Sequence, residues 1–449
     1  MGDLDFPRDF LWGAATASYQ IEGAVNAGGR GPSVWDTFSH TPGKTENGDT
    51  GDVACDHYNR YQSDVALMSD LGLQAYRFSI AWPRLMPTGR GEVNAEGVDF
   101  YNRLIDALLE KGIKPCATLF HWDYPQALHD AGGWTHPDAG KWFGDYAELC
   151  FKSFGDRVKF WITHNEPWCY AFLGHQAGAH APGLMDEELA FKVGHGLLLG
   201  HGEAVSRYRA LGQDGKIGIT TNHQHHAPLD PTSELDQKAS SQQNDWMNGW
   251  FLDPIYFGQY PEYLRNTYPM PEFTDEQIKM VSQKTDFMGL NFYVVAKVKY
   301  NPDCHNQAEQ IDVPETQHTD MGWMVVPDTL RETLVYSKQK WNPDEIYITE
   351  NGCAFDYPVE NGKVHDVNRV EFLKNYIGAA HQAMGQGVPL KGYFVWSLMD
   401  NFEWAFGYTK RFGVVHVNYA TQERFIKDSG MMYREIIRAN SLEPVLARA

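Results

Sequence analysis

Short apolar runs recur along the chain, and segments with helical periodicity separate them. Eight such runs occur, at residues 10–17, 75–80, 114–120, 160–163, 216–221, 287–292, 346–349 and 392–397. Between them, apolar side chains recur every three or four residues, which predicts helices over residues 58–71, 98–111, 143–154, 189–211, 330–340 and 370–384. Gly72 and Gly112 follow the first two of these segments, at the position where helices commonly end.

Strands that are apolar throughout and alternate with helices are typical of a parallel sheet covered on both faces. Eight of them predict an α/β protein, a closed (β/α)₈ TIM barrel with long βα loops at the mouth formed by the C-terminal strand ends. The alternative is an open doubly wound sheet, but no G-x-G-x-x-G motif opens a helix. No linker, repeat or low-complexity tract divides the chain, so residues 1–449 are expected to form one domain. Residues 300–320 carry no strong periodicity and are expected to form a long loop at the mouth.

Composition narrows the range of partners and compartments. The formal net charge is −20, which disfavours nucleic acid and anionic membrane surfaces as partners. The sequence begins without a basic, apolar leader and contains no run of membrane-spanning length, so a cytoplasmic protein is expected. The 6 cysteines form no C-x-x-C pair, which favours free thiols over a disulfide framework or a zinc site.

Two of the predicted strands end in the same order of residues, an apolar run followed by Thr and then Glu. Residues 159–168 (KFWITHNEPW) contain Glu166, and residues 346–352 (IYITENG) contain Glu350, which precedes an Asn-Gly pair that predicts a turn. The C-terminal ends of all strands of a (β/α)₈ barrel meet at one mouth. We therefore expect the two carboxylates to lie close together although they are far apart in sequence.

The other strand ends add amides, an imidazole, indoles and a third carboxylate. These residues are Gln20, Arg77, His121, Trp122, Asn165, Asn222, Asn291, Tyr293, Trp396, Glu403 and Trp404. Any one of them could simply cap backbone groups near water. Together, with a single arginine among them, they predict a site for a neutral, polyhydroxylated ligand, because indole faces also suit the C–H faces of sugar rings.

Two carboxylates across a sugar-sized pocket are the groups that hydrolyse a glycosidic bond. Glu350 is expected to be the ionised one, because Arg77 and Tyr293 can stabilise its charge. Glu166 is expected to be the acid, because Pro167, Trp168 and the like charge of Glu350 favour its protonated form.

A metal site is the competing interpretation of these residues. Glu166, Glu350, Glu403 and His121 could ligate an ion, and His223, His225 and His226 form a second histidine cluster. No H-x-x-x-H or H-E-x-x-H motif accompanies them, and the ring of tryptophans suits a sugar better than an ion. We therefore expect no metal and no cofactor, and we interpret the histidine cluster as a polar rim loop.

These motifs resemble those of family 1 glycoside hydrolases, the β-glucosidases and their relatives. Residues 161–168 (WITHNEPW) and 348–352 (ITENG) are similar to the two signature motifs of the family, and residues 10–23 (FLWGAATASYQIEG) resemble its N-terminal signature. The similarity continues at residues 77–82, 119–122, 289–293 and 396–404, so it covers essentially the whole chain.

The resemblance implies a retaining mechanism, with Glu350 as nucleophile and Glu166 as acid and then base, their carboxyl groups about 5–5.5 Å apart. It also implies roles for further side chains. Gln20, His121, Asn165 and Glu403 would bind the glycone hydroxyls, Trp122, Trp396 and Trp404 would line that subsite, and Trp323 would be the aglycone platform. Relatives that act on 6-phosphorylated sugars carry a small hydroxyl residue in place of Glu403, and thioglucosidases carry Gln in place of Glu166. Both carboxylates are present here, which favours an unphosphorylated O-glycoside.

The departures from the family pattern lie on the expected aglycone side. His164 fills a usually apolar position, and residues 173–176 and 222–226 are rich in histidine. Trp168, Cys169, Leu173, His180 and Asn222 are expected to shape the aglycone channel. We hypothesise that bulky side chains there hinder re-entry of product glucose, with ordinary packing as the alternative.

The first functional hypothesis is a retaining β-glycosidase with a small-molecule β-glycoside as its partner. It would hydrolyse terminal non-reducing β-D-glucosyl residues of cello-oligosaccharides or of aryl and alkyl β-glucosides, and would release glucose. Within the family, a preference for β-galactosides or β-fucosides, or for transfer to sugar acceptors, is the alternative. A non-catalytic sugar-binding protein on the same scaffold is the hypothesis from another class.

Overall fold

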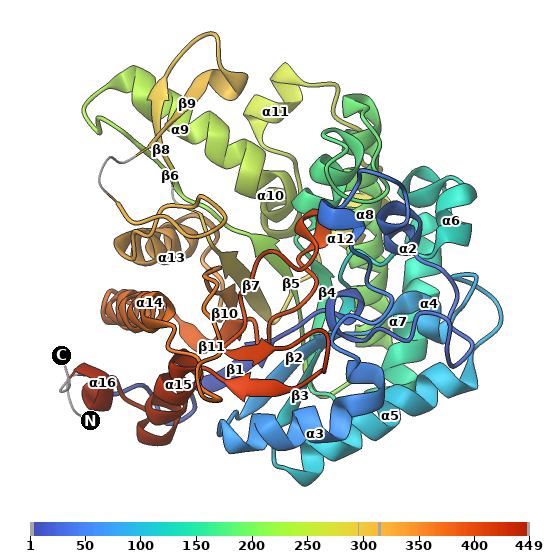
Figure 1. Cartoon of the computed structure of the whole chain (residues 1–449). Coiled ribbons are helices and arrows are strands. Elements are labelled where there is room, and N and C mark those ends of the chain that lie inside the picture. Colours follow the sequence, from blue (N-terminus) through green and yellow to red (C-terminus); the bar gives the residue numbers. More distant parts are fainter. Residues whose placement is uncertain (1–3, 295, 313–315, 447–449) are drawn as a thin grey trace.

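The computed structural model describes residues 4–294, 296–312 and 316–446. Eight parallel strands close into a barrel in the order β1-β11-β10-β7-β5-β4-β3-β2 (Figure 1). Their bounds are β1 Leu11–Ala15, β2 Ala75–Ser79, β3 Lys114–Phe120, β4 Phe160–Asn165, β5 Lys216–Asn222, β7 Phe287–Phe292, β10 Ile346–Asn351 and β11 Leu390–Trp396. Each of the eight predicted runs forms one of these strands. The predicted (β/α)₈ barrel is therefore confirmed, and the open doubly wound sheet is excluded.

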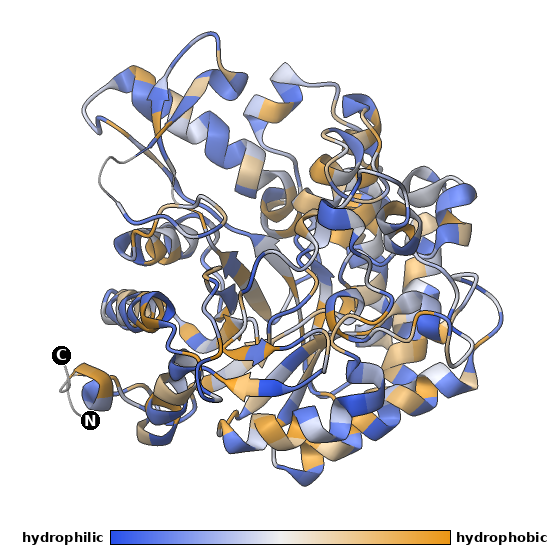
Figure 2. Ribbon diagram, viewed as in Figure 1, coloured by the Kyte–Doolittle hydropathy of each residue, from blue (hydrophilic) through white to orange (hydrophobic). Residues whose placement is uncertain are grey.

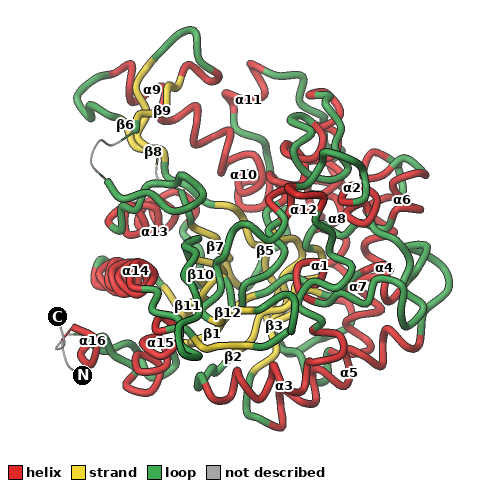
Figure 3. The backbone as a smooth tube through the Cα atoms, in the orientation of Figure 1, coloured by secondary structure: helices red, strands yellow, loops and turns green. Residues whose placement is uncertain are grey.

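Helices surround the barrel on its outer side (Figure 3). The six predicted from periodicity are α3 His57–Asp70, α5 Ala95–Glu110, α7 Ala139–Phe154, α8 Glu187–Ala210, α13 Asp328–Trp341 and α14 Val367–Gly385. The others are α1 Ser18–Ile21, α2 Val34–Ser39, α4 Trp82–Leu85, α6 Gln126–Asp130, α9 Glu234–Asn244, α10 Trp250–Phe257, α11 Glu262–Thr267, α12 Asp275–Val281, α15 Asp428–Ala439 and α16 Glu443–Leu446. Hydrophobic and hydrophilic residues alternate along the outer helices, as Figure 2 shows for α3 and α5. In α5 the buried face includes Phe100, Leu104 and Leu108, which explains why the three-and-four spacing predicted this helix.

The structure corrects part of the loop that is predicted over residues 300–320. Ala308–Ile311 forms β9, which pairs antiparallel with β8 (Ala296–Tyr300), and β8 also pairs with β6 (His226–Pro228). This small sheet packs on α9 at the top left of Figure 1. Ala308, Glu309 and Gln310 are not strong strand formers, and the strand exists because β8 supplies its hydrogen-bonding partner. Residues 313–315 of the predicted loop lie outside the described residues.

A second pair of short strands lies close to the end of the chain. β12 (Val415–Val417) pairs antiparallel with β13 (Arg424–Ile426). Within the described ranges, no helix is both long and apolar enough to cross a bilayer.

The polarity of the barrel interior changes from one end to the other. Near the N-terminal strand ends, the ring centroids of Phe160 and Phe287 lie 4.2 Å apart, and Phe160 also contacts Tyr347. Further along the strands, Thr220 donates a hydrogen bond to Thr349 (3.2 Å). The interior is thus apolar at one end and polar at the C-terminal end, where charged groups can be bound.

Several histidines are buried between the barrel and its helices, where they cannot hold a charge easily. His201 of α8 bonds through Nδ1 to the Thr163 hydroxyl of β4 (2.8 Å), and His223 bonds through Nε2 to Ser337 (2.9 Å). His164, the departure noted above, stacks on Phe143 and donates from Nε2 to the Leu197 carbonyl (2.9 Å). Burial lowers the pKa of His201 and of His223 to about 3.

We expect these histidines to make the fold sensitive to acid. An unfolded histidine titrates near pH 6.5, so the unfolded chain binds protons first as the pH falls below that value. The free energy of unfolding is then lost at about 1.4 kcal/mol per pH unit and per histidine between roughly pH 6.5 and 3. The thermal midpoint, measured at several pH values, should fall less steeply for His201→Gln, which does not titrate, than for the wild type. Parallel pH dependences of the two proteins would contradict this account.

Candidate active site

A cavity of about 360 Å³ is formed by residues at and beyond the C-terminal strand ends. The predicted residues that line it are His121, Trp122, Asn165, Glu166, Trp168, Cys169, Leu173, His180, Asn222, Asn291, Tyr293, Trp323, Glu350, Trp396, Glu403 and Trp404. Gln20 and Arg77 do not line the cavity but bond to residues that do. The structure therefore brings both glutamates and the predicted sugar-site residues into one concave site.

Glu350 is in β10, next to its C-terminal end, and the Asn-Gly pair after it does not form the predicted turn. Asn351 is still in the strand, where its side chain donates to the Phe292 carbonyl (2.7 Å) and accepts from the Tyr393 hydroxyl (2.6 Å). Gly352 is required for another reason, because a Cβ there would lie 1.7 Å from the carbonyl oxygen of Trp396. Asn351 and Gly352 therefore allow the C-terminal ends of β10 and β11 to pack closely.

Both oxygens of Glu350 have a direct hydrogen-bond donor. Arg77 donates from Nη1 to Oε1 (2.6 Å), and the Tyr293 hydroxyl donates to Oε2 (2.7 Å). Burial raises the pKa of Glu350 above its ordinary value, and Arg77 and Tyr293 oppose this rise by stabilising the charged form. The partners that the sequence predicts for an ionised Glu350 are therefore in contact with it.

Glu166 follows β4 directly and has a different environment. Its backbone φ is +44°, a left-handed conformation that the surrounding structure must impose on a residue other than glycine. The Asn291 amide donates to Oε1 of Glu166 (2.8 Å) and also contacts Glu350, so one side chain joins the two carboxyl groups. Burial, followed by the negative charge of Glu350, raises the pKa of Glu166 to about 8. Glu166 therefore holds a proton at neutral pH.

The hydrogen bonds of Asn165 show which ring nitrogen of His121 carries the hydrogen. Oδ1 of Asn165 accepts from Arg77 (2.6 Å) and from Asn291 (3.0 Å), so its NH₂ group faces Nε2 of His121 (2.9 Å). Nε2 therefore accepts and Nδ1 holds the hydrogen. Burial and the charge of Arg77 keep the pKa of His121 well below its ordinary value, so the ring is neutral. Within the described chain Nδ1 has no partner, and it can donate to a ligand.

Gln20 and Glu403 form a second polar group at the cavity. Nε2 of Gln20 donates to the Phe402 carbonyl (2.8 Å) and to Asn401 Oδ1 (3.1 Å), and it lies 3.5 Å from Oε2 of Glu403. Among the described residues, the buried Oε1 of Gln20 has no hydrogen-bond partner. Burial and the charges of Glu350 and Glu166 raise the pKa of Glu403 to about 8.

Aromatic side chains form one wall of the cavity. The rings of Trp122 and Trp404 lie 4.7 Å apart, and Nε1 of Trp122 donates to the Asn165 carbonyl (2.8 Å). Both tryptophans have positive φ, +80° and +52°, as Glu166 does. His180, which the sequence predicts on the aglycone side, lies against Trp122 and also contacts Trp35. It therefore supports the wall that contains the predicted glycone tryptophans.

The remaining lining is largely apolar. Cys169 and Leu173 lie in a π-helical turn, η3 (Cys169–Leu173), and the Cys169 thiol hydrogen-bonds to Glu166. The sequence analysis missed Gln224, Met247, Val294, Met321, Phe406 and Phe412. Gln224 and Val294 follow strand ends closely, so the strand-end rule could have found them. Met247 comes from a second π-helical turn, η4 (Asp245–Gly249), Phe406 from a 3₁₀ turn, η6 (Trp404–Phe406), and the other two from loops, and periodicity does not reveal these positions.

The histidine cluster after β5 is directed toward neighbouring helices. His223 bonds to Ser337 of α13, and the ring of His225 stacks on Tyr336 of the same helix with centroids 4.3 Å apart. Among the residues that the structure describes, no group of three or more His, Cys, Asp or Glu side chains is arranged to hold a metal ion.

Comparisons with known proteins identify the class and then the family. Glycosyl hydrolase family 1 matches residues 3–442. The chain is 51% identical to Beta-glucosidase A of Thermotoga maritima over 98% of this chain and 99% of that protein. It is 50% identical to the 1,4-beta-D-glucan glucohydrolase of Thermotoga neapolitana over 97% of this chain and 99% of that protein. A solved structure of the Thermotoga maritima β-glucosidase in complex with deoxynojirimycin has a TM-score of 0.93 and 49% identity, covering 98% of this chain and 99% of that chain.

The barrel and these matches define a glycoside hydrolase. The chain belongs to glycosyl hydrolase family 1. The family and the enzyme class predicted from the motifs are therefore confirmed.

Proposed function

We propose that this protein is a retaining β-glucosidase that releases terminal β-D-glucosyl residues from cello-oligosaccharides or from aryl and alkyl β-glucosides. Relatives that share about half of its residues over nearly their whole length are named β-glucosidase or 1,4-β-D-glucan glucohydrolase. We infer that residues 1–449 act as one catalytic unit. The 6 free cysteines, four of them buried, favour a reducing compartment such as the cytoplasm.

One observation carries the mechanism: two carboxyl groups line the same cavity and have different hydrogen-bond partners. Glu350 has a donor on each oxygen, one of them a guanidinium, whereas the pKa of Glu166 is raised to about 8. A nucleophilic carboxylate and a general acid on the same glycosidic bond are what double displacement requires. We expect their carboxyl groups to lie about 5–5.5 Å apart, as a retaining mechanism needs.

In the first step, the ionised Glu350 attacks the anomeric carbon of the bound sugar. Glu166 gives its proton to the glycosidic oxygen as the bond from that oxygen to the anomeric carbon breaks. The aglycone leaves as a neutral alcohol, and the sugar is bonded to Glu350 as a glycosyl ester.

The second step reverses the role of Glu166. Esterification removes the negative charge of Glu350, which is one of the two main causes of the raised pKa of Glu166. The pKa of Glu166 falls, so Glu166 is ionised and accepts a proton from water that attacks the anomeric carbon. The ester bond to Glu350 breaks, and glucose is released with its original β configuration.

The residues around the sugar favour a neutral glycone. His121, with its Nδ1 donor, and the carboxyl group of Glu403 line the cavity, and Gln20, whose Oε1 has no partner among the described residues, lies next to Glu403. Burial and nearby negative charge already raise the pKa of Glu403, and the same effects disfavour a phosphorylated sugar at this position. Trp323 is our candidate for the aglycone platform, and Trp168, Cys169, Leu173 and Asn222 line the same cavity.

A nitrophenyl β-glucoside and a 2-deoxy-2-fluoro glucoside together test this proposal. We expect steady hydrolysis of the first, with β-glucose as the product detected initially by NMR. The second should accumulate as a covalent ester, and peptide mapping should find it on Glu350. Binding without turnover would instead indicate the non-catalytic sugar-binding protein. Attachment to another carboxylate would overturn the assignment of Glu350.

A further inference from the structure

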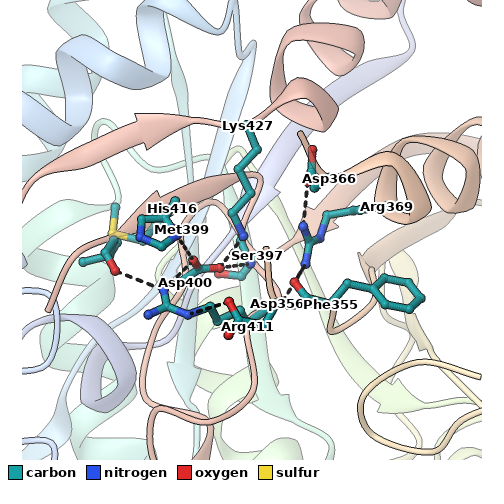
Figure 4. A network of polar contacts seen from close by, with 12 residues as sticks. Phe355, Asp356, Asp366, Arg369, Ser397, Met399, Asp400, Arg411, His416 and Lys427 are labelled. Atoms are coloured by element: carbon teal, nitrogen blue, oxygen red, sulfur yellow. Dashed lines mark hydrogen bonds and ion pairs between the residues drawn. The ribbon is translucent and has the colours of Figure 1, made fainter. Parts of the chain in front are cut away.

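A cluster of charged side chains is buried behind the loop that carries Glu403 and Trp404. Asp400 lies at its centre and is fully buried (Figure 4). Its Oδ1 accepts from Lys427 Nζ (2.7 Å) and from the backbone amide of Gly413 (2.9 Å), and its Oδ2 accepts from Arg411 Nη1 (2.9 Å). We call Asp400, Arg411 and Lys427 the Asp400 cluster.

The Asp400 cluster is ionic, although burial opposes charge. Burial favours the protonated form of Asp400, but Lys427 and Arg411 keep its pKa below the ordinary value. A buried ion pair usually adds little stability compared with apolar side chains of the same volume, because desolvation offsets the attraction between the charges. The cluster therefore calls for an explanation other than stability, and its neighbours provide one.

One set of contacts leads from Asp400 to the sugar side of the cavity. The next residue, Asn401, donates to Ser397 Oγ (2.9 Å) and accepts from Gln20 Nε2 (3.1 Å). The same amide of Gln20 lies 3.5 Å from Oε2 of Glu403. These contacts connect Asp400, through the neighbouring Asn401, to Gln20 and Glu403.

A second set of contacts connects the Asp400 cluster to Tyr293, which hydrogen-bonds to Glu350. Arg411 precedes Phe412, which lines the cavity with its ring centroid 6.1 Å from that of Tyr293. Tyr293 donates to Glu350. Gly413 packs directly on Asp400, since a Cβ there would lie 2.0 Å from the Asp400 nitrogen.

Arg369 of α14 joins the loop that contains Arg411 to the segment that contains Phe355. It pairs with Asp366 (2.6 Å) and donates from Nη2 to the carbonyls of Arg411 (2.6 Å) and Phe355 (2.7 Å). Phe355 belongs to the segment that follows β10 and Glu350. Figure 4 shows Arg369 between Asp366 and Phe355, with the Asp400 cluster beside them.

We propose that Asp400 is a positioning residue for the glycosidase reaction, which acts through Arg411 and Asn401 to place Phe412 and Glu403 around the sugar. This inference rests on the proposed function. Asp400 itself does not line the cavity. A displacement of about 1 Å in a positioned group can lower a rate about 100-fold, so the effect of losing the Asp400 carboxylate is measurable.

Asp400→Asn is the principal test, with Asp64→Asn as its matched control. Asp64 is also a buried carboxylate, bonded to His57 (2.8 Å) and Arg424 (3.0 Å), and none of these three residues lines the cavity. We expect both variants to lower the thermal midpoint. At a temperature where both are folded, kcat/KM for a nitrophenyl β-glucoside should fall about 100-fold in Asp400→Asn and stay near the wild-type value in Asp64→Asn.

A double-mutant cycle with Glu403→Gln separates positioning from general damage. If Asp400 acts through Glu403, adding Asp400→Asn to Glu403→Gln should reduce kcat/KM by a smaller factor than adding it to the wild type. If Asp400→Asn does not fold, Arg411→Met and Arg411→Lys replace it. The first should lower kcat/KM, and the second should recover part of the loss.

The possible failures of these experiments have different meanings. A wild-type protein without β-glucosidase activity would contradict the proposed function. An active wild type with unchanged kcat/KM in Asp400→Asn, additive losses in the cycle, or equal values for Arg411→Met and Arg411→Lys would overturn the role of Asp400.

Discussion

Glu350→Gly is expected to lower kcat for a nitrophenyl β-glucoside by roughly 10⁵-fold, because a nucleophile that forms the covalent intermediate is absent. The backbone of β10 should tolerate the change, since the carboxylate points into a cavity. Arg77 and Tyr293 lose their shared partner and leave a cationic space of carboxylate size. Azide or formate should enter this space and partly restore cleavage of an activated aryl glucoside.

The stereochemistry of the rescued product makes this prediction sharp. Azide that replaces Glu350 attacks from the face opposite the leaving group, so the product should be the α-glucosyl azide. Glu345→Gly is the matched control, because Glu345 lies just before the other end of β10 and pairs with Lys216 outside the cavity (2.5 Å). That variant should keep its turnover and form no azide adduct. Normal turnover of Glu350→Gly, or a β-glucosyl azide, would disprove the assignment.

Glu166→Ala is expected to affect substrates according to their leaving group. General acid catalysis contributes about 10²–10⁴-fold, and it matters most when the leaving oxygen is a poor leaving group. Hydrolysis of cellobiose or an alkyl glucoside should therefore fall by that factor, whereas formation of the glycosyl ester from a dinitrophenyl glucoside should change little. Glu403→Gln, which removes another carboxyl group of raised pKa, should impair both kinds of substrate equally.

The pH dependence gives a second measurement on the same variant. In the wild type, kcat/KM should fall as the pH rises above about 8, because Glu166 loses the proton that it donates. In Glu166→Ala, this alkaline limb should be absent with the dinitrophenyl substrate. A limb that persists would indicate Glu403, whose pKa is also about 8, as the group that titrates. Equal losses for good and poor leaving groups would argue against Glu166 as the acid.

The strand ends show which residues of the site can be predicted from the sequence. Glu166 and Glu350 could be found because each follows an apolar run, and strands of a closed parallel barrel share one mouth. Met247 and Phe412 could not be found in this way, since they reach the cavity from loops and turns whose path depends on long-range packing. The same limit explains β9, which exists because β8 lies beside it.

The sequence by itself determined the barrel and singled out the two glutamates that line its cavity. Apolar runs and helical spacing are local properties, and so are the motifs at the strand ends. Only the tertiary structure decided how strongly burial and neighbouring groups shift the pKa of each carboxyl group. A pKa depends on burial and on charges within a few ångströms, and these come from distant parts of the chain: Arg77 from β2 and Asn291 from β7.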